Sequence, residues 1–123
     1  MRPTIEEQLT ALVRILREVV VPAVNGDYPR DIATEAAATL ETLAKGWADV
    51  PAFLAWDAAR TAELLRDVGV ETPQPPAEPL DLRALAAHHA ALRAMLAEHI
   101  AEVSTDGAVA HFRERASRYP IRP

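Results

Sequence analysis

The amino-acid sequence predicts an all-α protein, a four- to five-helix bundle with a proline-rich connector at about residues 70–80. Apolar residues recur every three to four positions along most of the chain, as on the buried face of a helix. No segment shows the alternation of apolar and polar residues that is typical of a strand. Glycine and proline fall between the periodic segments, where helices are expected to end. At 123 residues, the chain is expected to form a single helical domain.

The first part of the chain is expected to hold two helices. The first, at about residues 4–24, opens with Thr4 and Glu7 at the spacing of a capping box. Pro22 is expected to kink or fray its end, because proline lacks a backbone N–H. The second helix, at about residues 30–47, has an apolar line built largely from alanine, which lets a neighbouring helix approach closely.

Three further helices are expected after residue 49. The first of these, at about residues 50–68, has Asp49 as N-cap and Pro51 in its first turn. The connector that follows contains four prolines and is expected to be extended. A helix at about residues 82–104 carries the three-four apolar spacing of a coiled-coil-like seam. A short last helix is expected at about residues 108–118.

Two of the four histidines, His89 and His99, fall on this seam. Ten residues span about 15 Å along a helix, so one metal ion cannot bridge the two side chains. The Glu-x-x-His motif of di-iron bundles is absent from the sequence. We interpret both residues as hydrogen-bonded core or interface histidines, and a small-molecule or metal pocket is the alternative.

Asp57 lies close to the inward face of the helix at residues 50–68, one turn before Thr61. A buried aspartate can serve as a base or a ligand. The interpretation we favour places Asp57 at the edge of that face, exposed or hydrogen-bonded to a neighbouring loop. If a pocket exists, the sequence predicts that Asp57, His89 and His99 line it.

No residues of the sequence form a recognisable catalytic, cofactor-binding or metal-binding set. Cysteine is absent, and the two serines, Ser104 and Ser117, lie at predicted helix ends outside any Gly-x-Ser-x-Gly turn. The four glycines are isolated, so no phosphate-binding loop is present. We therefore expect the chain not to be catalytic alone and to hold no cofactor of its own.

Charge and hydropathy limit the classes of partner. A net charge of −5 argues against nucleic acid, because neutralising phosphates needs an excess of Lys and Arg. No stretch reaches the roughly 18 apolar residues of a membrane span, and the charged N-terminus does not resemble a signal peptide. A cytoplasmic location is the expectation.

Two features are candidates for protein contact. Trp56 falls off the inward face of its helix and is expected to be exposed, and exposed tryptophans often anchor interfaces. The C-terminal stretch is basic, since Arg113, Arg115 and Arg118 are opposed only by Glu114. Cations also suit the negative end of a helix dipole, so the simpler interpretation is a solvated helix end. Contact with an anion or a partner is the alternative.

The first part of the chain, residues 12–43, resembles a family of small bacterial helical proteins of uncharacterised function. Its members open with an amphipathic helix that ends in Val-x-Pro-Ala, followed by a glycine-containing turn and an alanine-rich helix. The corresponding segments here read LREVVVPAVNG at residues 16–26 and IATEAAATL at residues 32–40. The tail SRYP, residues 117–120, is loosely similar to the family's Pro-Arg-Tyr ending.

Members of this family accompany phosphotransferases of the aminoglycoside-kinase type, and in at least one pathway the pair acts as a 4-hydroxyacyl-CoA kinase. The resemblance therefore implies a non-catalytic accessory subunit that stabilises or activates such a kinase, in acyl-CoA catabolism, with ATP and Mg²⁺ held by the partner. The matching segments are structural, and no catalytic residue is carried over. Two alternatives stay open: a homo-oligomeric bundle with a pocket near Asp57, His89 and His99, and self-association through the seam of the helix at residues 82–104.

Overall fold

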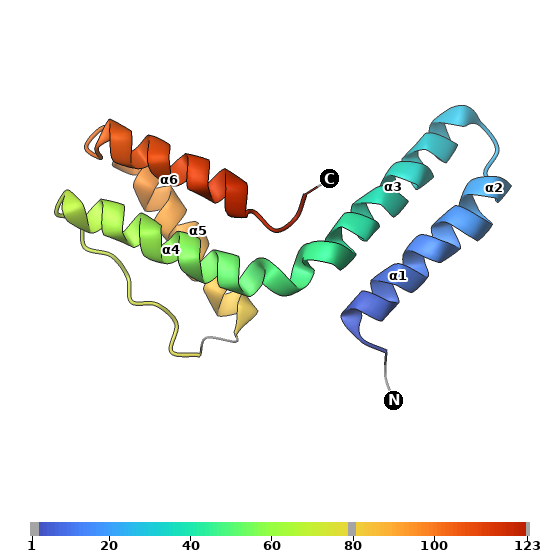
Figure 1. The fold of residues 1–123 in the computed structure, drawn as a ribbon, viewed down its shortest axis with the longest axis horizontal. Helices are drawn as coiled ribbons and strands as arrows, with labels where there is room; N and C mark the ends of the chain where they lie inside the picture. Colours follow the sequence, from blue (N-terminus) through green and yellow to red (C-terminus); the bar gives the residue numbers. More distant parts are fainter. Residues whose placement is uncertain (1–2, 79–80, 123) are drawn as a thin grey trace. The chain divides into compact units, whose positions relative to one another are not determined.

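The computed structural model describes residues 3–78 and 81–122, and in them every regular element is a helix (Figure 1). The all-α prediction is therefore confirmed, and residues 70–78 of the expected connector form neither helix nor strand. The chain divides into two compact units, one formed by the residues up to Ala48 with the tail after Tyr119, the other by Asp49–Tyr119. None of the described helices is both long enough and apolar enough to cross a membrane.

The first unit is an antiparallel pair of helices. Helix α1, Ile5–Ile15, continues through a π-helical turn, η1, Leu16–Val20, into the short α2, Val21–Ala23, and packs beside α3, Asp27–Gly46 (Figure 1). The predicted capping box is present, since the Thr4 hydroxyl accepts a hydrogen bond from the Glu7 amide at 3.1 Å.

The π-helical turn η1 comes directly before Pro22. Because Pro22 has no N–H, it cannot donate to the carbonyl four residues back. The chain accommodates this in the preceding turn, where the Val21 amide reaches back five residues to Leu16. The α3 helix then starts at Asp27, three residues before the predicted start, after Gly26 turns the chain at a φ of +100°.

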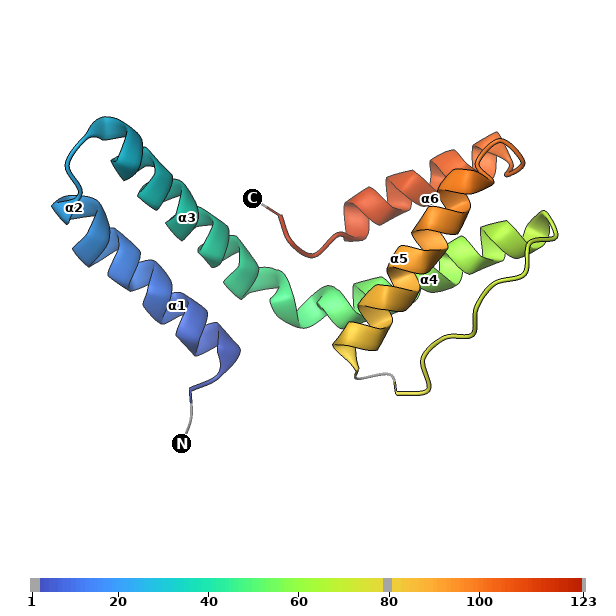
Figure 2. The ribbon, with the colours of Figure 1, turned by 180° about the vertical axis from the view of Figure 1, so that it is seen from behind.

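The second unit is a three-helix bundle in which α4 contacts both other helices. Helix α4, Val50–Asp67, follows a short 3₁₀ turn, η2, Trp47–Asp49, and packs against α5, Leu82–Glu98, and α6, Thr105–Arg118 (Figure 2). Asp49 occupies the N-cap of α4 as predicted, but its side chain makes no capping bond. The apolar core consists of seven buried residues: Ala58, Ala62, Leu65, Leu92, Leu96, Val103 and Ala108.

Two predicted helix boundaries in this unit are wrong. The helix expected at residues 82–104 ends at Glu98, and the turn that follows carries Val103 back into the core. The last helix begins at Thr105 instead of residue 108, because Ser104 caps it through a bond from the Gly107 amide at 3.3 Å. The segment Thr-Asp-Gly, residues 105–107, forms the first turn of α6.

Candidate functional site

All three helices of the second unit contribute to a polar cluster around Asp57. Helix α4 supplies Asp57 and Thr61, which lie four residues apart and so share one helix face. Helix α5 supplies His89, and α6 supplies His111 and Arg115, again four residues apart. We call these five residues the Asp57 network.

The carboxylate of Asp57 is the centre of the network. Its Oδ2 accepts from His89 Nε2 at 2.5 Å and from Arg115 Nε at 2.9 Å. Its Oδ1 lies 3.0 Å from His111 Nε2, at an angle outside hydrogen-bond geometry, so this contact is electrostatic. The same His111 nitrogen lies 3.4 Å from the Thr61 hydroxyl. One carboxylate thus links α4 to both α5 and α6.

The centre of the network is buried, although the Arg115 side chain at its edge is 25% exposed. Asp57 is 0% exposed, and the His89 and His111 side chains belong to residues that are 8% and 4% exposed. A buried carboxylate is tolerated only where charged or hydrogen-bonding partners compensate its lost hydration, and here Arg115 supplies the positive charge. The Asp57 carboxylate itself is out of reach of a molecule in solution, so the arrangement is suited to holding helices together.

His111 is held neutral by its surroundings. Burial lowers the pKa of His111 below its usual value, the positive charges of Arg115 and Arg60 lower it further, and the nearby Asp57 carboxylate opposes them. Placing the single ring proton on Nε2 directs it toward Asp57 and Thr61. The buried Nδ1 then remains an acceptor without a hydrogen-bond partner.

The geometry does not favour a metal ion in the network. No group of three or more His, Asp or Glu side chains in the described part of the chain is arranged to hold one. Arg115 gives a physical reason, because its positively charged guanidinium already donates to Oδ2 of Asp57 and would repel a metal cation there.

The structure joins part of the predicted pocket and separates the rest. Asp57 and His89 are in direct contact, whereas His99 caps the end of α5 and pairs with Glu102 at 3.0 Å. The favoured placement of Asp57 at an exposed edge is wrong, because α6 covers it. Sequence reasoning missed His111 and Arg115 as partners of Asp57, although their four-residue spacing matches that of Asp57 and Thr61.

The candidate contact residues are also placed differently from the sequence prediction. Trp56 is partly buried instead of exposed, with the Arg118 guanidinium stacked 4.5 Å from its ring centre. Arg115 is engaged with Asp57, and Arg118 also pairs with Glu114 at 2.9 Å. Arg113 is exposed on α6.

Most of the α5 seam packs inside the second unit, although Leu82 at its start is 48% exposed. Its apolar members Leu85, Leu92 and Leu96 are buried inside the second unit, where α5 packs on α4. The coiled-coil-like spacing therefore describes packing within the chain.

A second candidate site is the outer surface of the first unit. Four apolar residues of the α1–η1 segment, Ile5, Leu12, Ile15 and Val19, are between 47% and 61% exposed. Their spacing places them within one arc of the helix, beside the face that contacts α3. We call these four residues the α1 stripe.

The first unit buries few apolar side chains of its own. Among its described residues, Val13 and Ala37 are the buried apolar ones. Polar contacts support the pair, since Arg17 lies 2.6 Å from Glu41 and lowers the Glu41 pKa, with a smaller effect from Lys45. Exposed ion pairs of this kind contribute little to the free energy of unfolding. Covering the α1 stripe would remove further apolar surface from water and so stabilise the first unit.

Comparison with known proteins yields no relationship: no family model matches the chain, and no curated protein or solved structure matches it significantly.

Proposed function

We propose that this chain is a non-catalytic accessory subunit that binds a phosphotransferase-like kinase through the α1 stripe. The observation that carries the proposal is the exposure of Ile5, Leu12, Ile15 and Val19 on a two-helix unit with little core of its own. Small proteins that expose a contiguous apolar surface commonly use it for protein contact. The class of partner follows from the resemblance of residues 12–43 to helical proteins that accompany such kinases.

The contribution of the subunit would be apolar burial. Covering the α1 stripe removes four large aliphatic side chains from water, and each contributes on the order of 1 kcal/mol at such partial exposure. That gain stabilises the partner and the first unit together. The kinase would supply the ATP and Mg²⁺ site, and the proposed role extends to acyl-CoA catabolism.

The decisive experiment is a tagged pull-down from the source organism, with the eluate sized and identified by mass spectrometry. We expect a kinase-like protein in stoichiometric amount. A Leu12→Glu, Ile15→Glu double variant should lose this partner, because it puts two carboxylates into the apolar contact. Val109→Glu is the matched control, since Val109 is an apolar residue of α6 that is 43% exposed; it should retain the partner.

Three outcomes would contradict the proposal. One is a clean homo-oligomer without a second protein. Another is equal loss, or equal retention, of the partner in the double variant and in Val109→Glu. The third is turnover of a substrate by the purified chain alone.

A further inference from the structure

We infer that the second unit carries a binding groove for a small aliphatic carboxylate, between α4, α5 and the proline-rich connector. The groove has a volume of about 280 Å³, close to the lower limit of typical small-molecule pockets. None of the residues that form the Asp57 network or the α1 stripe lines it. The inference is independent of the proposed kinase partner.

The floor of the groove is apolar and flat. Ala55, Ala59 and Ala62 follow one another on a single face of α4 at four- and three-residue spacing, with Ala58 beside them. Leu85 of α5 completes the floor. Alanine side chains are short, so the connector does not fill the space above them. This surface suits an unbranched hydrocarbon chain.

The wall opposite the floor is formed by the connector. Its lining residues run from Thr72 to Pro76, and three of these five residues are prolines, which restrict the backbone. An extended proline-rich segment loses little conformational freedom when a ligand binds, which favours a preformed groove. Figure 2 shows the connector running from the end of α4 back toward the start of α5.

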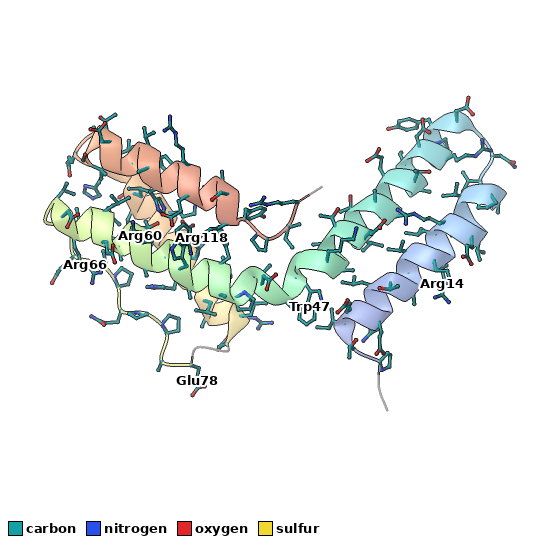
Figure 3. The ribbon with its side chains drawn as sticks, viewed as in Figure 1. Arg14, Trp47, Arg60, Arg66, Glu78 and Arg118 are labelled. Carbon is teal, nitrogen blue, oxygen red and sulfur yellow. The ribbon has the colours of Figure 1, made fainter. Side chains whose placement is uncertain are left out.

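The charge of the lining residues favours a ligand with an anionic head group. Arg66 and His88 line the groove, whereas no acidic residue is among the described residues that line it. Figure 3 shows Arg66 near the point where the connector leaves α4. Arg66 also borders a neighbouring hollow with Glu71, but among the described residues no ion pair joins the two.

Charge and shape together therefore fit an amphiphilic anion. The Arg66 guanidinium can bind both oxygens of a carboxylate through paired N–H donors. Ala55 and Arg66 are separated by about 16 Å along the helix, which leaves room for a chain of several methylenes behind the carboxylate.

The probe for this site is sodium hexanoate, titrated into the full chain labelled with ¹⁵N and followed by two-dimensional NMR. We expect saturable shifts, with a Kd of millimolar order, at the amides of Ala59, Ala62, Arg66 and Gln74. Ala59→Leu should weaken binding by about tenfold, because an exposed alanine of the floor is replaced by a side chain that fills the groove. Ala97→Leu, on an exposed position of α5 outside the groove, should leave the Kd within about twofold.

The carboxylate is tested separately from the apolar floor. Arg66→Gln should weaken hexanoate binding by about tenfold and leave the binding of neutral hexanamide unchanged. Arg93→Gln, at an exposed position of α5, is the control. Shifts that do not saturate, or equal Kd values in Ala59→Leu and Ala97→Leu, would overturn the site. Equal binding of hexanoate and hexanamide, both insensitive to Arg66→Gln, would overturn the assigned ligand class.

Discussion

The two units of the chain differ in how many apolar and charged side chains they bury. The three-helix unit buries a core of leucine, valine and alanine and adds the Asp57 network, whose central carboxylate is fully buried. The two-helix unit buries little beyond Val13 and Ala37 and exposes the α1 stripe. Two helices cannot enclose a core between them, whereas three can. The difference indicates that the second unit is stabilised by its own interior, and that the first gains from a surface that covers it.

The largest expected effect is at the centre of the second unit. Asp57→Ala should lower the free energy of unfolding by about 4 kcal/mol, because it leaves Arg115 and His89 without their shared partner. Urea denaturation followed by far-UV circular dichroism measures this. Asp31→Ala, on an exposed position of α3, should change the same quantity by about 0.5 kcal/mol or less. Similar losses in both variants would mean that the network is not stabilising.

A second prediction compares one leucine from each unit. Leu92→Ala should lower the free energy of unfolding by about 3 kcal/mol, because Leu92 is fully buried and its loss leaves a cavity. Leu12→Ala should lower it by about 0.5 kcal/mol, because Leu12 already faces water. The same denaturation experiment checks both. If Leu12→Ala were as destabilising as Leu92→Ala, the α1 stripe would be part of an interior in solution.

The sequence predicts the type of each element better than its ends. Periodicity placed every helix of the second unit, because spacing of apolar residues directly reflects burial. It could not place the end of α5, since Val103 keeps the apolar spacing while serving as a core residue in a turn. The start of α3 was missed for a local reason. Gly26, which marks the end of the preceding helical segment, also occupies the N-cap of α3 at a positive φ, so α3 begins directly after it.

The Asp57 network was only half visible in the sequence. Asp57 and His89 stood out as polar residues on or near apolar faces, and they do meet. His111 and Arg115 resembled parts of a solvated basic helix end. Which helix packs against Asp57 depends on the tertiary arrangement of α4, α5 and α6, which spacing within single helices does not encode.

A third prediction concerns the loss of stability of the second unit at acidic pH. Because folding lowers the pKa of His111, the unfolded chain binds more protons than the folded chain, and stability rises with pH. The contribution is present above the unfolded value of about 6.5 and is lost as the pH falls below it. Asp57 opposes this shift, while Arg115 and Arg60 reinforce it.

The variant His111→Gln removes the titrating ring. Unfolding free energies measured at several pH values between about 8 and about 5.5 should fall less steeply in His111→Gln than in the unmodified chain. An equal or steeper fall in the variant would show that His111 is not the group responsible.

The smallest expected effect is at the surface of the second unit, where Arg118 stacks on Trp56. Arg118→Ala should lower the free energy of unfolding by about 0.5–1 kcal/mol, the usual size of an exposed cation–π contact, and the Glu114 pair should add little. It should also change the fluorescence of Trp56, measured with Trp47 replaced by Phe. Arg113→Ala, on an exposed position of the same helix, should change neither quantity. Identical spectra in the two variants would mean that Trp56 is free of Arg118 in solution, and Trp56 would then be available for a partner, as the α1 stripe is.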